Sequence, residues 1–248
     1  MGNPYETEKL VAEYLFFHYA DEDEVSGGLP IPREALNFPV RVVGELVDPA
    51  RRARTALDLG CAVGRSSFEL ARVAHSVLGI DFSAAFIRAA ETMKREGRLG
   101  CRVPIEGERT AEFTARVPAG IDVARVSFET GDATALREDI GRFDIVLAAN
   151  LLCRLPEPAK FLGLLPDLVS PGGQLLLGTP FSWLPEYTAP DHWIGGRDAA
   201  GPSWEALCKI LEPHFELHLS KDLPFLIREH SRKFQYGVSL GSRWIRRP

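Results

Sequence analysis

The sequence offers little metal or disulfide chemistry and no long apolar run. None of its cysteines forms a Cys-x-x-Cys pair or lies at zinc-ligand spacing from a histidine, so we expect no metal site and reduced thiols at Cys61, Cys101, Cys153 and Cys208. No apolar stretch approaches the length of a membrane-spanning helix, and the polar, acidic start of the chain, residues 1–14, does not resemble a signal peptide. These absences predict a cytoplasmic chain that does not contact a membrane.

Positive charge is also scarce. Lys and Arg number 29 against 34 Asp and Glu, which gives a formal net charge of −5. Nucleic-acid binding needs clustered Lys and Arg for phosphate contacts, so no nucleic-acid partner is expected. The one basic cluster, at the end of the chain, is interpreted as a solvated tail and comprises Arg243, Trp244, Arg246 and Arg247.

Strand and helix patterns alternate along most of the 248 residues, and 45% of the residues are hydrophobic, as in a globular protein. Such alternation favours a Rossmann-like, doubly wound α/β fold with a mostly parallel sheet of seven strands. Strands are predicted at 55–59, 76–80, 123–130, 143–149, 174–179 and 215–219, with one or two more between 225 and 240. Helices are predicted at 65–73, 83–96, 158–169 and 203–211, with Ser83 as a cap and a turn at 171–173.

Two segments fall outside this alternation. Residues 1–50 are predicted to form an N-terminal helical cap or lid, with a helix that begins at Asn3, a loop at 21–28 and a second helix at 39–47. Around Glu106-Gly107-Glu108, residues of about 99–122 are predicted to form an inserted β-hairpin. Residues 51–248 then make up the main α/β part, and the whole chain is expected to be one structural unit.

A glycine loop follows the first predicted strand, in Asp58-Leu59-Gly60-Cys61-Ala62-Val63-Gly64. It lies at the carboxyl end of that strand, where open α/β sheets bind ligands. It lacks the Gly-x-Gly-x-x-Gly pattern of dinucleotide sites and the Gly-Lys-Ser/Thr ending of a phosphate loop. A ligand without phosphates therefore suits it, and a plain strand–helix turn with two convenient glycines is the simpler alternative.

Carboxylates end the next two predicted strands. Asp81 could accept both hydroxyls of a ribose, and Asp132, in Gly131-Asp132-Ala133, could accept the amino group of an adenine or could simply cap a helix. Together with Asp58 and the glycine loop, these residues follow three successive strands on one edge of the sheet.

This series resembles the class I S-adenosylmethionine-dependent methyltransferases over roughly residues 54–177, including Phe143-Asp144-Ile145-Val146 and Pro171-Gly172-Gly173. The resemblance implies that the glycine loop flanks the methionine part of the cofactor and that the methyl acceptor lies beyond Asn150. The cofactor, S-adenosylmethionine, is expected to contact Asp58, Gly60, Cys61, Gly64, Asp81, Phe82, Asp132, Ala133 and Asn150.

A narrower resemblance covers nearly the whole chain. Several segments resemble the 4-mercaptohistidine N1-methyltransferase family of ovothiol biosynthesis: Asn3–Thr7, Tyr14–Tyr19, Ala35–Arg41, Arg154–Pro156, Gly178–Trp183 and Phe225–His230. Some members are fused to an iron-dependent sulfoxide synthase, so this chain would be its stand-alone partner. The resemblance implies methylation of an imidazole nitrogen of 4-mercaptohistidine (5-thiohistidine), a small thiol-bearing histidine, to give ovothiol.

Acceptor residues are expected in three groups, each with core or surface packing as the alternative. Aromatic side chains of the cap and of the loop after Thr179 could enclose the acceptor and exclude water: Tyr5, Tyr14, Phe38, Phe181, Trp183, Tyr187 and Trp193. An arginine could bind the acceptor carboxylate, with candidates Arg41, Arg154 and Arg228. A proton acceptor or orienting group could be His192, His230, His18 or Tyr187.

Two rival functions stay open. Another small acceptor, such as a carboxylate, a phenol or a quinone, is one alternative, and a cofactor-binding partner protein without catalytic activity is the other. The Asn/Asp-Pro-Pro-Tyr motif of many amino-group methylases is replaced by Asn150-Leu151-Leu152-Cys153, which argues against DNA-base and protein-glutamine methylation. The glycine pattern argues against a nicotinamide dehydrogenase.

Overall fold

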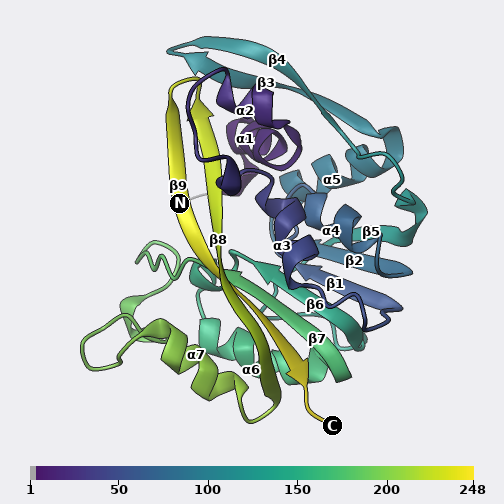
Figure 1. Ribbon diagram of the computed structural model, residues 1–248, viewed down its shortest axis with the longest axis vertical. Coiled ribbons are helices and arrows are strands. Elements are labelled where there is room, and N and C mark those ends of the chain that lie inside the picture. The colour runs from purple at the N-terminus through teal and green to yellow at the C-terminus, as the bar shows by residue number, and fades with distance from the viewer. Residues whose placement is uncertain (1–3) are drawn as a thin grey trace.

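The computed structural model describes residues 4–248, which form a seven-stranded sheet in the order β5-β2-β1-β6-β7-β9-β8 (Figure 1). All neighbours are parallel except at β9, which runs antiparallel to both β7 and β8. The strands are β1 Thr55–Leu59, β2 Ser76–Asp81, β5 Val126–Thr130, β6 Phe143–Ala149, β7 Val169–Thr179, β8 Phe215–His230 and β9 Lys233–Arg246. The predicted fold class is confirmed.

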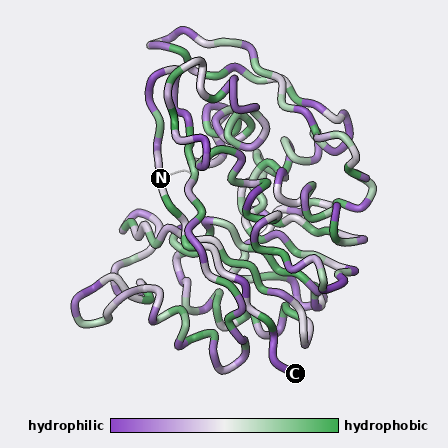
Figure 2. The backbone as a smooth tube through the Cα atoms, in the orientation of Figure 1, coloured by the Kyte–Doolittle hydropathy of each residue, from purple (hydrophilic) through white to green (hydrophobic). Residues whose placement is uncertain are grey.

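Helices cover both faces of this sheet, and two hydrophobic cores result (Figures 1 and 2). On β6, Ile145 and Leu147 join one core, whereas Val146 and Ala148 join the other, as the two-residue period of a strand requires. One face carries α3 Phe38–Leu46, α4 Arg65–Leu70 and α5 Ala84–Glu96, and the other carries α6 Pro158–Leu168 and α7 Ser203–Leu211.

Most predicted helix bounds agree with the structure within a few residues, whereas four strands differ. The strand predicted at 215–219 continues as β8 to His230, and β9 extends beyond the predicted region to Arg246. Residues Val123–Arg125, predicted as strand, form a 3₁₀ turn capped by Asp122. The predicted turn at 171–173 lies within β7, where Gly172 has a φ of +76° and the pairing with β6 shifts register. Only glycine adopts such a φ freely, so the turn became a kink in an otherwise continuous strand.

The cap is more helical than predicted. A 3₁₀ helix, Pro4–Glu6, stands where the helix start was predicted, and the predicted cap Asn3 lies outside the described residues. The α-helix α1, Glu8–Tyr19, follows after Thr7, whose Oγ1 accepts a hydrogen bond from Leu10 N. Residues predicted as a loop contain α2, Glu22–Ser26, because Asp21 and Glu24 form a reciprocal capping box.

The inserted hairpin is confirmed and joins a larger assembly around the cap. It consists of β3 Arg98–Glu106 and β4 Arg109–Arg116. β8 and β9 extend beyond the end of β7, where Leu240 pairs with both Thr179 and Asp222. From there the two strands stay paired as far as His230 and Lys233, a length of roughly 25 Å at the usual rise per residue. This extension packs on α1, and its turn meets the hairpin where Ser231 Oγ donates to Ile105 O at 2.6 Å. The upper part of Figure 1 shows α1 enclosed by these strands.

The basic chain end is part of the sheet, so its interpretation as a solvated tail is wrong. The side chain of Trp244 is fully buried, and its Nε1 donates to Ser242 Oγ at 2.9 Å. Arg243 donates to Leu46 O, at the end of α3, at 3.2 Å. Both faces of β9 are covered here, because Trp244 and Ile245 point to opposite faces and both are buried, while Arg243 and Arg246 donate to carbonyl groups. Within residues 4–248, no helix combines the length and the apolar content that crossing a membrane would need.

The buried position of Trp244 gives a stability test. Trp244→Ala should lower the free energy of unfolding by about 3–5 kcal/mol, because it leaves a large cavity in the core. Urea unfolding followed by circular dichroism measures the change. Arg247→Ala, an exposed neighbour, should change it by about 0.5 kcal/mol or less. A loss below about 1 kcal/mol for Trp244→Ala would contradict this placement.

Candidate active site

The Asp81 carboxylate joins two neighbouring segments at the carboxyl edge of the sheet. Its Oδ2 accepts a hydrogen bond from Ala62 N at 2.9 Å, and its Oδ1 accepts one from Ser83 N at 2.8 Å. Burial raises the pKa of this carboxyl group, and the two N–H donors oppose that rise. Each oxygen retains a free acceptor position, as a pair of ribose hydroxyls would require.

The glycine loop adopts backbone conformations that few residues tolerate. Gly60, Ala62 and Gly64 have φ values of +73°, +47° and +86°. A Cβ on Gly64 would come within 2.7 Å of the Phe128 ring, so this glycine is needed for packing as well as for the turn. Ala62 was not among the predicted site residues, although its position between two glycines was the available signal. A left-handed alanine is strained, and such strain is typical of functional loops.

Two predicted cofactor residues of this region, Asp58 and Cys61, have buried side chains. The Cys61 side chain is 2% exposed, and burial raises the pKa of its thiol far above the usual range. Asp58 is 1% exposed and accepts a hydrogen bond from Ser67 Oγ of α4 at 2.6 Å. Burial raises the pKa of Asp58 to about 7 despite this donor. Both residues support the loop, and their contact with the cofactor stays a prediction.

The adenosine-side residues differ in how accessible they are. Phe82 directly follows Asp81 and is 67% exposed, more than any other large hydrophobic side chain in residues 4–248. Ala133 is buried, and Asp132 Oδ1 accepts hydrogen bonds from both N and Oγ1 of Thr134. Asp132 therefore does form the local turn that the alternative interpretation expected. Its Oδ2 makes no hydrogen bond to residues 4–248 and stays available to a ligand.

Asn150 follows β6 in a strained, left-handed conformation with a φ of +55°. Its backbone N donates to Gly178 O at 2.7 Å, and its Oδ1 accepts a hydrogen bond from the buried Ser239 hydroxyl at 2.5 Å. The neighbouring Leu151 lies 3.0 Å from the Cβ position of Gly60. Asn150 therefore lies beside the glycine loop, with its side-chain carbonyl group held by β9.

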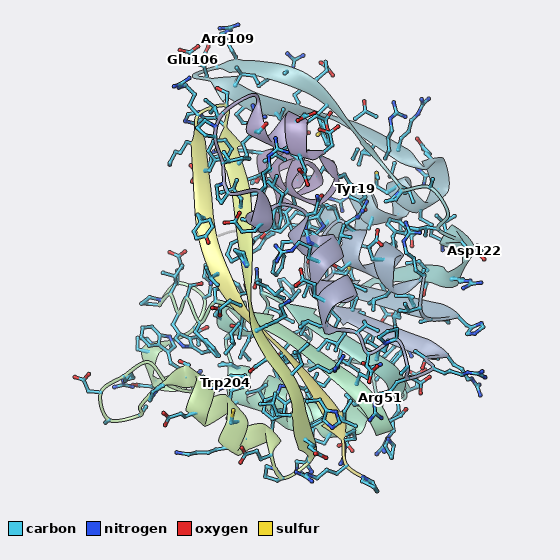
Figure 3. All side chains as sticks on the ribbon, viewed as in Figure 1. Tyr19, Arg51, Glu106, Arg109, Asp122 and Trp204 are labelled. Carbon is cyan, nitrogen blue, oxygen red and sulfur yellow. The ribbon has the colours of Figure 1, made fainter. Side chains whose placement is uncertain are left out.

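The N-terminal segment crosses this edge. Ser83 Oγ donates to Tyr5 O at 2.8 Å, and Ala85 N donates to Glu6 Oε2 at 3.2 Å. Tyr19 is the last residue of α1, and Figure 3 labels it at the cap. Its Oη donates to Val63 O of the glycine loop at 2.8 Å. The cap is thus bonded directly to both the loop and the start of α5, as a lid would be.

Three tyrosines and one arginine gather beside Asp81. The hydroxyl group of Tyr5 is hydrogen-bonded to Tyr187, and the Tyr14 ring lies 4.7 Å from that of Phe86. Burial raises the pKa of Tyr14 to about 12. The guanidinium group of Arg154 lies 4.9 Å from the Tyr187 ring and is close enough to lower the pKa of both other tyrosines. The four side chains form a tyrosine cluster that consists of Tyr5, Tyr14, Tyr187 and Arg154.

The other predicted aromatics lie around it. Phe38 packs against the backbone of Gly178 and stacks on Phe17, with ring centroids 6.4 Å apart. Phe181 follows β7 with a φ of +49°. Trp183 stacks on Trp193 and donates to Ser203 Oγ of α7, so this pair packs toward α7.

Four predicted acceptor residues are engaged elsewhere. Arg41 is bonded to Glu45 and to the carbonyl groups of Glu34 and Pro224. Arg228 donates to Glu24 O and covers Phe16, and His230 lies at the turn of the β8–β9 extension. His192 is exposed, with its Nδ1 2.9 Å from Pro156 O. The structure does not bring these four side chains to the strand-end residues, and their catalytic or binding roles remain untested predictions.

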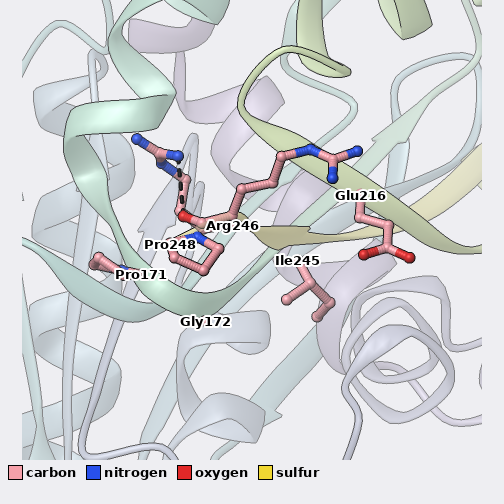
Figure 4. A pocket seen from close by; sticks show the side chains of 7 residues that line it. Pro171, Gly172, Glu216, Ile245, Arg246 and Pro248 are labelled. Carbon is pink, nitrogen blue, oxygen red and sulfur yellow. Dashed lines mark hydrogen bonds between the residues drawn. The ribbon is translucent and has the colours of Figure 1, made fainter.

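A surface hollow near the chain end lies at the opposite edge of the sheet (Figure 4). It involves the start of β7 and the end of β9, so it is separate from the glycine loop. Its lining consists of Pro171, Gly172, Glu216, Ile245, Arg246, Arg247 and Pro248.

Comparison with known proteins agrees with this geometry. Residues 57–177 match a family model described as a methyltransferase domain. Ubiquinone biosynthesis O-methyltransferases are 25% identical over 128 residues in Coxiella burnetii and 27% identical over 150 residues in Xanthomonas axonopodis. These matches cover 52% and 60% of this chain and 44% and 52% of the relatives, so this chain matches only about half the length of each relative.

Solved structures show the same fold over nearly the whole chain. Magnesium protoporphyrin IX methyltransferase from Synechocystis, solved with bound S-adenosylmethionine, aligns with a TM-score of 0.54 at 19% identity, over 99% of this chain and 100% of that one. The N-methyltransferase NodS from Bradyrhizobium japonicum, in complex with S-adenosylhomocysteine, aligns with a TM-score of 0.52 at 17% identity, over 96% and 98%.

Residues 57–177 therefore match a methyltransferase domain, and the chain shares the fold of structures solved with S-adenosylmethionine or S-adenosylhomocysteine bound. The residues present fit the cofactor: Asp81 has free acceptor positions for a ribose, Phe82 offers an exposed ring beside it, and the strained loop brings backbone close to a ligand. The cofactor supplies an electrophilic methyl group.

Loss of the Asp81 carboxylate should weaken cofactor binding. We expect Asp81→Ala to raise the dissociation constant of S-adenosylhomocysteine about 10- to 100-fold, because ribose hydroxyls and two backbone N–H groups lose their acceptor. Isothermal titration calorimetry measures it, with circular dichroism to verify folding. Asp139→Ala, an exposed carboxylate distant from the loop, is the matched control. Equal affinity of Asp81→Ala and wild type would remove Asp81 from the site.

Asp58 predicts a pH dependence of stability. Folding raises the pKa of its carboxyl group from 3.8 to about 7, so the folded protein holds this proton more tightly than the unfolded chain. The stabilisation from this proton is complete below about pH 4, declines as the pH rises and is lost above about pH 7. Asp58→Asn does not titrate, so its free energy of unfolding relative to wild type should increase by about 1–3 kcal/mol between pH 5 and pH 8. Urea titrations at both values test this. Asp167→Asn, an exposed control, should show no such increase, and a flat difference for Asp58→Asn would refute the raised pKa.

Proposed function

We propose that this chain transfers the methyl group of S-adenosylmethionine to an imidazole nitrogen of 4-mercaptohistidine. The supporting observation is the position of Arg154, the one candidate arginine that the fold places in the tyrosine cluster. Its Nη1 donates to the carbonyl groups of Cys153 and Ser182, and its Nη2 donates to Ser182 Oγ. Its Nε makes no hydrogen bond to residues 4–248. A guanidinium group held in this way can bind the carboxylate of an amino-acid acceptor.

Closure of the cap favours a small acceptor. The hydrogen bond between Tyr5 and Tyr187 connects the N-terminal segment to the loop after β7, above Asp81. Methyl transfer is an in-line displacement, and holding both partners aligned in a dry site can supply roughly 7–11 kcal/mol of the barrier. This chain contributes alignment and exclusion of water, through the tyrosine cluster and the backbone of the glycine loop.

The acceptor itself would come from an enzyme that places sulfur on the imidazole ring of histidine. By the family resemblance this enzyme is an iron-dependent sulfoxide synthase, and the two enzymes would act in sequence.

The cysteines of this chain are free thiols in the structure, and no disulfide joins them.

A phenolic acceptor is the second candidate, favoured by the names of the Coxiella and Xanthomonas relatives. Those matches cover about half of each protein, a length similar to that of the methyltransferase domain match. The cofactor-binding residues lie in this part, and their similarity says little about which acceptor is methylated. A cofactor-binding protein without turnover is the third candidate, and a panel assay separates the three.

The panel should contain 4-mercaptohistidine, histidine, a catechol and 4-mercaptoimidazole, which lacks the amino-acid part. With methyl-labelled cofactor, we expect the highest kcat/KM on 4-mercaptohistidine and ring-N-methylated product by mass spectrometry. Preference for the catechol would establish the second candidate, and cofactor binding without turnover on any acceptor would establish the third.

Arg154 gives a sharper test of acceptor binding. Arg154→Ala should raise the KM for 4-mercaptohistidine about 10- to 100-fold, the usual effect of losing a charge-assisted hydrogen bond, with cofactor affinity unchanged. The KM for 4-mercaptoimidazole should not change, because that acceptor has no carboxylate. Arg142→Ala, at an exposed ion pair with Asp167, controls for loss of charge. Equal effects on both acceptors would show that Arg154 does not bind a carboxylate.

A further inference from the structure

The imidazole of His18, on α1, has no hydrogen-bond partner among residues 4–248. Its Nδ1 is closed off from solvent, although the side chain as a whole stays partly exposed. A buried polar atom without a partner costs about 1–3 kcal/mol, and an unpaired group of this kind in a folded protein calls for an explanation. A ligand that supplies the missing hydrogen bond is one such explanation.

The neighbours of His18 place it over the cofactor loop. The next residue, Tyr19, donates to Val63 O of that loop, and Arg65 lies over the Tyr19 ring at 5.6 Å. One helical turn back, Tyr14 lies 5.8 Å from the His18 ring and belongs to the tyrosine cluster beside Asp81.

On its other side His18 approaches the Asn150 end of the site. The Phe17 ring lies 5.3 Å from it and stacks on Phe38, which packs against Gly178, and Gly178 O accepts the hydrogen bond from Asn150 N. Packed rings therefore connect His18 to Tyr14 of the tyrosine cluster on one side and, through Phe17 and Phe38, to the Asn150 segment on the other.

His18 is neutral at physiological pH. Burial, with a further contribution from the nearby Arg65 guanidinium, lowers its pKa to about 3. A neutral ring is compatible with a sulfonium ion close by, whereas an imidazolium would repel it. A ring with so low a proton affinity is a hydrogen-bonding group rather than a general base.

We propose that His18 binds the methyl acceptor by accepting a hydrogen bond from its ring N–H group. This inference rests on the proposed function and specifies the acceptor as an azole with one lone-pair nitrogen and one N–H nitrogen. Aromatic rings of Tyr14 and Phe17 flank the imidazole and restrict its orientation.

The reaction balances without a base on the protein. The lone-pair nitrogen of the acceptor forms the N–C bond as the C–S bond breaks, and that electron pair stays on sulfur to give S-adenosylhomocysteine. The positive charge moves to the acceptor ring, whose N–H becomes more acidic and binds the neutral His18 more strongly. This interaction is stronger in the transition state than in the ground state, so it lowers the barrier. The N–H proton then leaves to solvent.

Two variants separate this role from a structural one. His18→Phe keeps a flat ring and removes both nitrogens, and we expect it to lower kcat/KM for 4-mercaptohistidine about 10- to 100-fold. Cofactor affinity should stay within about threefold, and the unfolding temperature should not fall, because the folded protein loses only an unpaired polar group. His18→Gln, which restores an acceptor, should recover most of the activity. His75→Gln, at the exposed opposite edge of the sheet, is the control.

Nitrogen NMR of the histidine rings tests the contact directly in the wild-type protein. With S-adenosylhomocysteine present, adding imidazole as a probe should shift the His18 ring signals, identified by their loss in His18→Gln. A shift caused by S-adenosylhomocysteine alone, with none on adding imidazole, would mean cofactor contact and would overturn the proposal, as would no shift at all. If wild type fails to methylate 4-mercaptohistidine while imidazole shifts His18, the proposed substrate is wrong and the azole-binding role of His18 stands.

Discussion

The carboxylate of Asp81 is the interaction on which the candidate site depends. Its two oxygens are bonded to the backbone of Ala62 and of Ser83, so one side chain sets the distance between the glycine loop and the start of α5. Ser83 in turn bonds the N-terminal segment at Tyr5. A buried negative group held by backbone donors is positioned before any ligand arrives, which reduces the cost of ordering the site on binding.

Enclosure of the site comes from segments far apart in the sequence. The cap helix α1 reaches the glycine loop through Tyr19, while the β8–β9 extension and the β3–β4 hairpin pack around the same helix. These segments together enclose α1 beside the glycine loop, in the place predicted for a lid. Two polar side chains beside the glycine loop and the tyrosine cluster are the proposed acceptor-binding groups: the unpaired His18 and Arg154, which is held by Ser182.

Sequence patterns predicted the sheet and its strand-end carboxylates well, because local periodicity and the glycine loop reflect backbone geometry directly. They did not predict contacts made across the fold. Arg41, Arg228 and His230 were plausible site residues by residue type. The fold bonds Arg41 to Pro224 O and Arg228 to Glu24 O, and it places His230 at the turn of the β8–β9 extension, so none of the three joins the tyrosine cluster. Trp244 was misassigned to a tail because a strand end that mixes three arginines with two apolar residues resembles a basic cluster in sequence.

The most direct test of the account is a crystal structure of this protein with S-adenosylhomocysteine. The account predicts ribose hydroxyls on the Asp81 carboxylate, the adenine beside Phe82 and Asp132, and the sulfur atom between the glycine loop and Asn150, with His18 facing the space where an acceptor would lie. A ligand bound elsewhere, or an adenosyl group that leaves Asp81 unpaired, would contradict it.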